Sequence, residues 1–461
     1  MTTPRARRFS RASAFLLGLT VAAVAGARAQ DAPASGQPAL RLTLEEARER
    51  ARASAPSLEQ ARAIERAARA EVDVARASGR PQVGLDAAYT RQSDVPELIL
   101  DVPGAGPNTI FPNIPNNYRA RLGGSLPVYT GGRLRALTRA AESEAEAAKA
   151  DVATSGADLV LETTSAYWDL VTSRESERVL SDSLVAYEAH LGDARHRFEV
   201  GLAARNEVLA VQVERDRAEL ARLRAANGAE VAEANLRRLV GAPPTARIET
   251  AEPLSAMPAG AVPVTEAESP MVEALVQEAL SHRPERVALE ERIAAGESRV
   301  KAERASAFPQ VSLSGGLDYA NPNRRILPPS AQWRDSWDVT LGLSWSVFDG
   351  GRRTAATKRA IARTDALRRQ AEDHDLRIRL QVTQRQLELA AARRAVEVAA
   401  GNVEAARENS RVAAERHQAG VIPSSERLDA EVLQLQAALD HTDALAQLRT
   451  VQAALDRAIG R

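Results

Sequence analysis

Residues 122–133 read LGGSLPVYTGGR, and residues 341–352 read LGLSWSVFDGGR at an offset of 219 positions. Both segments alternate apolar with small or polar residues and end in Gly-Gly-Arg, which predicts a strand followed by a tight turn. The segment RASGRPQV at 76–83 recurs as RASAFPQV at 304–311, with an offset of 228. The chain is therefore one structural unit written twice. Nine extra residues between these landmarks in the first copy indicate a longer loop.

Each copy contains two segments in which apolar residues occupy every second position. Val339, Leu341 and Leu343, for example, alternate with Thr340 and Gly342, which predicts a strand with one apolar and one polar face. The segments approach the ~9–11 residues that a tilted transmembrane strand requires. We expect strands at about 83–94, 118–128, 311–320 and 337–348. Polar loops rich in proline and asparagine should separate the paired strands, at 91–117 and 320–335.

Outside the strands the pattern becomes helical. From Gly132 to Gly201, and from Gly351 to Gly420, the chain covers 69 positions without a proline, and a helix of that length would extend about 100 Å. The pattern resumes after Gly201 and Gly420, so we expect these two glycines at the tips of helical hairpins. A heptad seam of valine or leucine, with alanine three positions later, predicts close helix packing. It comprises Val382, Leu389, Val396 and Val403 with Ala392, Ala399 and Ala406.

The repeats define the expected domain organisation. The first repeat covers 42–243 and opens with Thr43 and Glu46 at capping-box spacing. Residues 244–270, rich in proline, alanine and glutamate, form the connector, and the second repeat covers 271–461.

The N-terminal residues 1–29 have the features of a signal peptide. They contain several arginines, a short apolar stretch and the small-x-small sequence Ala27-Arg28-Ala29. The apolar stretch is shorter than the ~20 residues of a membrane-spanning helix. We therefore expect cleavage after Ala29 and export of the mature chain from the cytoplasm.

The composition excludes several classes of protein. The 461 residues include no cysteine, which rules out disulfides, thiol nucleophiles, cysteine-ligated zinc and a lipid-modified N-terminal cysteine. The 61 basic and 61 acidic residues balance, which argues against nucleic acid as a partner. Aromatic residues form 3% of the chain, and because aromatics dominate globular cores, this shortage favours long, closely packed helices.

Four strands cannot close a barrel by themselves, because lipid does not tolerate open sheet edges and eight strands is the usual minimum. A membrane barrel built from this chain must therefore be shared between subunits. Twelve strands from a trimer are the simplest solution, although the strand count alone also permits a dimer with eight.

The order of these motifs, repeated with equal spacing, resembles the TolC-like outer-membrane efflux family. The resemblance covers nearly all of the mature chain and implies a mainly α fold with a small β part. It implies a homotrimer: a twelve-stranded barrel in the outer membrane, continued by a long α-helical barrel in the periplasm. The implied function is the passive exit duct of a tripartite efflux or type I secretion system, working with an inner-membrane pump and a periplasmic adaptor. Besides the signal peptide, the resemblance rests on LTLEEA at 42–47, PVYTGGR at 127–133, SVFDGGR at 346–352 and FEVGL at 198–202.

The resemblance also implies where an aperture lies. The family narrows its periplasmic mouth with rings of acidic residues, and by position Glu426 and Asp429 fall there, with Glu207 in the first copy. Carboxylates repeated around a threefold axis would concentrate negative potential and favour cations. A compatible alternative is helix capping, in which Asn206 and Ser425 are N-caps and Glu207 and Glu426 are first-turn acids.

The contacts that close the mouth differ from the family pattern. In the family a tyrosine and an arginine near the tip hold the mouth closed, whereas His417 and Ile422 occupy those places here. Arg416 and Arg427 are the candidate substitutes. The tips expected to dock the adaptor are Gly201, Leu202, Gly420 and Val421.

The sequence contains no catalytic constellation, so we expect neither enzymatic activity nor a cofactor. Its six histidines lack metal-ligand spacing, and we interpret them as solvated helix positions. The alternative function is a soluble periplasmic coiled-coil structural or adaptor protein, but membrane-spanning strand length in both copies favours the duct. The sequence does not name the cargo, nor does it separate drug efflux, metal efflux and type I secretion.

Overall fold

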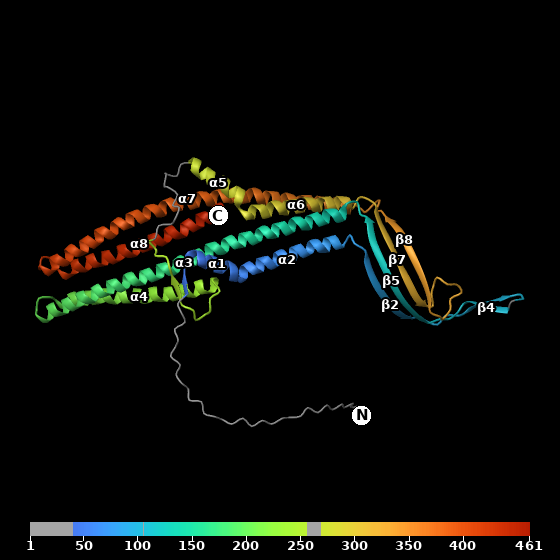
Figure 1. The fold of residues 1–461 in the computed structure, drawn as a ribbon, viewed down its shortest axis with the longest axis horizontal. Coiled ribbons are helices and arrows are strands. Elements are labelled where there is room, and N and C mark those ends of the chain that lie inside the picture. Colours follow the sequence, from blue (N-terminus) through green and yellow to red (C-terminus); the bar gives the residue numbers. More distant parts are fainter. Residues whose placement is uncertain (1–39, 105, 256–268) are drawn as a thin grey trace, which may run out of the picture.

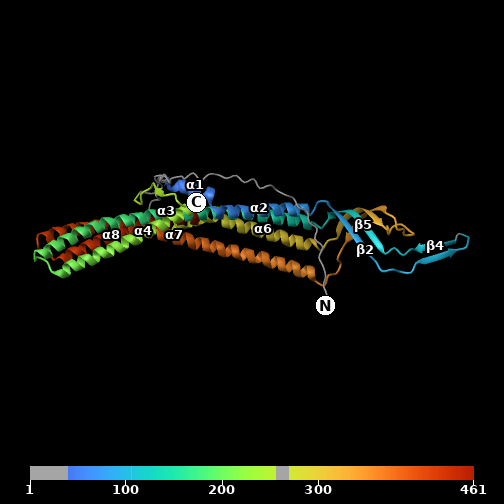
Figure 2. The same ribbon diagram turned by 90° about the horizontal axis from the view of Figure 1, so that it is seen from below.

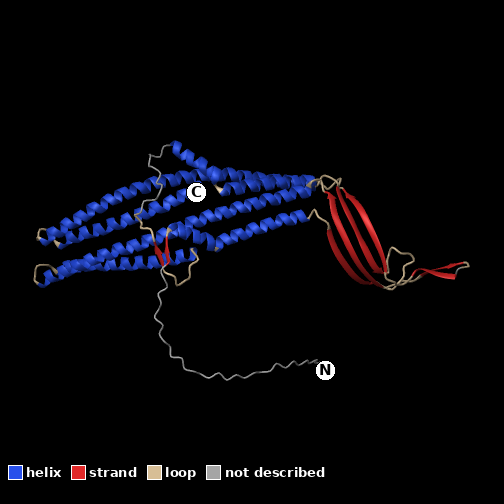
Figure 3. Ribbon diagram, in the orientation of Figure 1, coloured by secondary structure: helices blue, strands red, loops and turns tan. Residues whose placement is uncertain are grey.

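The computed structural model describes residues 40–104, 106–255 and 269–461. The predicted signal peptide and part of the predicted connector lie outside the described residues. The molecule is elongated, with a sheet at one end and two helical hairpin tips at the other (Figure 1, Figure 3). Its elements are β1 (Leu40–Leu42), α1 (Leu44–Ser54), α2 (Pro56–Ala77), β2 (Gln82–Arg91), β3 (Leu98–Val102), β4 (Gly106–Phe111), β5 (Asn116–Tyr129), α3 (Arg133–Glu199), α4 (Arg205–Leu239), β6 (Ile248–Thr250), α5 (Ser269–His282), α6 (Pro284–Ala305), β7 (Gln310–Asn321), β8 (Arg334–Ser344), α7 (Arg352–Gln418) and α8 (Ser424–Ile459).

The two long helices predicted from the proline-free stretches are confirmed. Helices α3 and α7 each contain 67 residues, and the shorter α2 and α6 each contain 22 and begin at equivalent prolines, Pro56 and Pro284. Along α7 the predicted seam faces inward, because Val382, Leu389 and Ala399 are all buried. Together these helices form the long, narrow body seen in both views (Figure 1, Figure 2).

The Gly-Gly-Arg landmarks mark the turn from strand to helix. Gly131 and Gly132 have φ values of 64° and 86°, which favour glycine, and Gly132 is the N-cap of α3. A Cβ atom on Gly131 would lie 2.7 Å from the carbonyl oxygen of Ala305 and 2.8 Å from the Cβ of Phe308. The first turn therefore needs glycine both for its conformation and for its packing against the end of α6.

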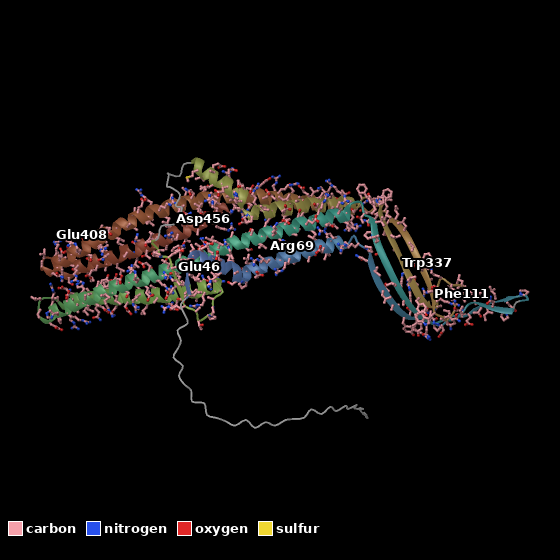
Figure 4. All side chains as sticks on the ribbon, in the orientation of Figure 1. Glu46, Arg69, Phe111, Trp337, Glu408 and Asp456 are labelled. Carbon is pink, nitrogen blue, oxygen red and sulfur yellow. The ribbon has the colours of Figure 1, made fainter. Side chains whose placement is uncertain are left out.

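The four long strands form one antiparallel sheet in the order β2-β5-β7-β8. Residues that lie side by side on the four strands form rows across the sheet, and successive rows point to opposite faces. In one such row all four side chains are apolar and exposed, and in the adjacent row, on the other face, all four are polar. The apolar row is Leu85, Leu122, Leu317 and Trp337, the last labelled in Figure 4, and the polar row is Asp86, Arg121, Asp318 and Ser336. Within the described residues, β2 and β8 each pair on one side, so both edges of the sheet are open.

Arginines and aspartates form ion pairs across the strands on the polar face. The Nε atom of Arg119 lies 2.7 Å from an oxygen of Asp318, and Arg121 bridges Asp318 and Asp338, with 2.9 Å to the latter. The polar face therefore pairs much of its charge within the sheet, and the opposite face presents an apolar surface.

Two details of the sheet differ from the sequence prediction. Strand β8 ends at Ser344 rather than near 348, because its partner β7 begins at Gln310, directly opposite Ser344, and offers no further backbone groups. The expected loop at 91–117 contains a second small hairpin, β3 and β4, which extends beyond the sheet (Figure 1). The nine extra residues of the first copy fall in the region that contains this hairpin.

The largest buried cluster lies midway along the molecule, where β1 pairs in parallel with β6. The predicted capping box of α1 is confirmed, since Thr43 and Glu46 exchange both hydrogen bonds. The hydroxyl of Tyr167, a fully buried residue of α3, donates to the carbonyl of Leu42 at 3.2 Å. Glu233 of α4 accepts the backbone N–H of Ile248 at 2.9 Å. These contacts hold the start of the first repeat and the end of α4 against the long helix.

None of the described helices is both long enough and apolar enough to cross a membrane.

Candidate functional site at the helical hairpin tips

The two hairpin tips have the same backbone geometry. Gly201 and Gly420 follow the C-caps of α3 and α7 with φ values of 77° and 72°. The next residues donate backbone hydrogen bonds back to the helix, Leu202 to the carbonyl of Arg197 at 2.8 Å and Val421 to that of Arg416 at 2.9 Å. This is the Schellman arrangement. Leu202 and Val421 are 78% and 64% exposed, so each tip presents an apolar residue at this equivalent position.

The three predicted acidic residues lie in the first two turns that follow the tips. Glu207 and Glu426 are the first-turn acids of α4 and α8, and Glu426 and Asp429 are exposed. The carboxylate of Glu426 lies 3.8 Å from the guanidinium of Arg416. Within the described chain, Asp429 has no ion pair or side-chain hydrogen bond. A single chain places Glu426 and Asp429 on one helix and does not by itself form a ring.

The predicted N-caps at Asn206 and Ser425 are wrong. The chain remains extended through Ala204 and Pro423, which are the cap residues, so both helices start earlier than expected. Proline has a fixed φ and no backbone N–H group that would need a hydrogen-bond acceptor. Pro423 is therefore well suited to the position just before α8 begins. Glu207 closes the first cap itself, because its carboxylate accepts the backbone N–H of Ala204 at 3.4 Å. The first-turn position predicted for Glu207 and Glu426 is correct.

Two histidines join the hairpins, and the prediction that all six are solvated is wrong for this pair. His190 of α3 is fully buried, and His417 of α7 is 4% exposed, with ring centroids 5.9 Å apart. The Nδ1 atom of His190 lies 2.8 Å from the carboxylate of Glu431, and Nε2 lies 3.0 Å from the hydroxyl of Ser424, both on α8. A usable signal existed in the sequence. His190 lies three residues after Tyr187 and four before Ala194, on an apolar stripe whose neighbours are buried.

Arg427 provides the second link between the hairpins. Its Nε atom lies 2.9 Å from Glu431, and its Nη1 atom lies 3.4 Å from Asp193 of α3. Both Arg427 and Glu431 have side chains that are 11% exposed. Arg416 instead pairs weakly with Glu426 and does not reach the first hairpin. Arg427 therefore links the two hairpins within one chain, its role in closing the mouth stays a prediction, and the sequence reasoning missed its partners Glu431 and Asp193.

The environment of this network disfavours a charge on His417. Burial is the main cause that lowers the pKa of His417 below its ordinary value, and the cationic side chains of Arg197 and Arg427 lower it further. His190 acts in the same direction, and the carboxylate of Glu207 opposes them. Burial, with the carboxylates of Glu431 and Glu214, also raises the pKa of the nearby Tyr187 to about 12. The contact between the hairpins is therefore built for a neutral imidazole and a neutral phenol.

Acidification should loosen the contact between the hairpins. When the hairpins separate, His417 becomes exposed and binds a proton at any pH below its ordinary pKa of about 6.5. The buried His417 of the packed state binds a proton only at lower pH. The packed state therefore loses stability, relative to the separated state, as the pH falls below about 6.5. In the duct that the resemblance implies, we expect openings to become more frequent between about pH 7.5 and about pH 5, measured by single-channel recording. His417→Asn should flatten this dependence, while the exposed neighbour His196→Asn should retain it. A His417→Asn channel with an unchanged pH profile would contradict the assignment.

Comparison with known proteins agrees with this architecture. The family model of the outer membrane efflux protein matches residues 47–242 and 275–461, which together are most of the chain. Protein CyaE of Bordetella pertussis is 28% identical over 422 residues, which cover 91% of this chain and 84% of that protein.

Solved structures share the fold. The CusC channel superposes with a TM-score of 0.77 at 16% identity, over 90% of this chain and 92% of that one. The open state of the MtrE outer membrane channel of Neisseria gonorrhoeae gives a TM-score of 0.73 at 19% identity, over 90% and 88% of the two chains. The chain therefore belongs to the outer membrane efflux protein family: it is the channel component of an export system, located in the outer membrane and extending into the periplasm.

Proposed function

We propose that three copies of this chain form one duct, in which twelve strands close a barrel in the outer membrane and the helices continue it across the periplasm. The observation that carries the proposal is the sheet with two open edges and one apolar face. Open strand edges are not tolerated in lipid, so β8 of one copy must pair with β2 of the next. Three copies give a barrel well above the usual minimum of eight strands.

The absence of cysteine from the chain allows a direct test of this stoichiometry. Ala87→Cys on β2 is combined in turn with cysteine at Trp337, Val339 or Leu341 on β8, because a disulfide forms only where Cβ atoms come within about 4 Å. We expect one combination to give a covalent species of three chains on a denaturing gel. Thr340→Cys with Ala87→Cys is the matched control, since these side chains lie on opposite faces. A product that stops at two chains would contradict the trimer.

The same proposal assigns a role to the hairpin tips. In the trimer Glu426 and Asp429 line the narrow periplasmic mouth, with Glu207 beside them, and their carboxylates favour cations there. The exposed apolar residues Leu202 and Val421, next to Gly201 and Gly420, provide the surface on which the periplasmic adaptor docks. The contact of His190 with Glu431 and the contact of Arg427 with Asp193 hold the two hairpins of each copy together when the mouth is closed. Substrate choice then resides in the inner-membrane pump, because a passive duct contributes little selection.

A further inference from the structure

The junction between sheet and helices contains an open cleft of about 690 Å³. The ends of α6 and β8, the start of β7 and the first turns of α3 and α7 surround it. Four arginines line it, Arg133, Arg352, Arg353 and Arg359, against two acids. A second cleft of about 350 Å³ shares Arg133 and Arg359 with the first and adds Arg299, which is paired with Glu144, and Arg363. Cavities of this size accommodate small organic ligands.

The acidic side chains at the junction leave much of this positive charge without a partner. Asp349 is engaged by Arg353 at 2.9 Å, and Glu303 lies 3.8 Å from Arg359, beyond hydrogen-bond distance. In the part of the chain that the structure describes, the side chains of Arg133, Arg352 and Arg363 have no ion pair or hydrogen bond. Elsewhere most arginines are paired, often with a glutamate three or four residues away, as Arg411 is with Glu408 and Glu415.

Helix stability does not explain these arginines. Positive charge is unfavourable at a helix N-terminus, yet α3 and α7 have no acid in their first turn and begin with arginine. Residues 133–141 contain three basic residues and no acid, and residues 352–364 contain five basic residues and no acid. By contrast, α1, α2, α4, α6 and α8 all have an acid in the first turn. The same costly arrangement occurs in both repeats, at equivalent positions.

The cleft opens on the polar face of the sheet. Gln310 and Ser344 line it and pair with each other at the last position of the β7–β8 ladder. Both lie an even number of residues from Asp318 and Asp338, so they share the polar face with the ion pairs of the sheet. In a barrel whose apolar face meets lipid, this face lines the lumen.

We propose that the unpaired arginines form a basic girdle inside the duct that binds small anions carrying carboxylate or phosphate groups as they pass. The girdle rests on the proposed trimer, in which Arg133, Arg352 and Arg363 contribute nine unpaired guanidinium groups. Guanidinium binds both carboxylate and phosphate in a bidentate manner. The girdle and the acidic mouth lie at opposite ends of α7, about 100 Å apart, so the two ends of the duct carry charge of opposite sign.

Side-specific block of single channels tests the girdle. Inorganic triphosphate added on the barrel side should block the current at a concentration at least about tenfold lower than on the periplasmic side, because clefts of one sign raise the local concentration of counter-ions by about 10-fold or more. The variant Arg133→Gln/Arg352→Gln/Arg363→Gln should weaken that block about tenfold and shift the zero-current potential in a salt gradient toward cation selectivity.

The matched control removes three arginines of α7 that have carboxylate partners, Arg369→Gln/Arg377→Gln/Arg394→Gln, and should leave both readings unchanged. A conducting channel with equal block from both sides, or a triple variant with unchanged block, would overturn the girdle while leaving the duct intact. A chain that forms no conducting channel overturns the duct and the girdle together.

Discussion

Val339→Arg is expected to abolish assembly of the channel in the outer membrane. Val339 is the central residue of β8, belongs to the apolar face and is 67% exposed in the single chain. An arginine that faces lipid at the middle of a membrane barrel costs about 2–4 kcal/mol. Three copies in one trimer would cost about 6–12 kcal/mol, which is comparable with the whole stability of a typical folded protein.

The next residue provides the matched control. Thr340 lies on the polar face, so Thr340→Arg should direct its charge into the lumen and change stability by less than about 0.5 kcal/mol, as for ordinary surface substitutions. The measurement is the amount of heat-modifiable oligomer in the outer-membrane fraction, with channel conductance as the second readout. Equal assembly of the two variants would contradict the assignment of the faces.

Glu426→Ala/Asp429→Ala should weaken block of the channel by divalent cations on the periplasmic side by about tenfold and raise conductance. In the proposed trimer the double variant removes six carboxylates from the mouth. Asp429 should account for more of the effect than Glu426. The charge of Glu426 is partly offset by Arg416 at 3.8 Å, whereas Asp429 has no ion pair within the described chain.

The control for this experiment removes the same number of charges from another part of the hairpin. Glu408→Ala/Glu415→Ala deletes two exposed acids of α7 that pair with Arg411, and Glu408 is labelled in Figure 4. This control should change the block by less than about twofold, since exposed pairs contribute little. If both double variants weaken the block equally, general surface charge and not an aperture explains the effect.

The sequence predicted the elements of this protein well because their signals are local. A period of two indicated the long strands, proline-free stretches bounded by glycine indicated α3 and α7, and Thr43 with Glu46 indicated the first cap. The error at Asn206 and Ser425 has a local cause as well. Several residues near each tip can cap a helix, and the choice depends on where the extended chain ends, at Ala204 and Pro423.

The candidate site was predictable only in part. The three acidic residues near the tips could be identified from their positions relative to Gly201 and Gly420. The partners of His190 and Arg427 could not, because they lie far away in the sequence. His190 and Glu431 are 241 residues apart, and Arg427 and Asp193 are 234 apart. No local pattern predicts such pairs, because they depend on how α3 packs against α8. The basic clefts have the same origin, since Arg133 and Arg352 meet only where the two repeats lie side by side.

The sequence by itself determined the duplication, the two kinds of period, the lengths of the elements and the glycines at the turns, because backbone preference and hydrophobic spacing act over a few residues. The tertiary structure decided the strand order β2-β5-β7-β8 and the open edges on either side of it. It also decided the burial of His190 and His417 and the unpaired arginines at the junction. Those features arise when surfaces more than two hundred residues apart are brought into contact, and only the packing of one repeat on the other brings them together.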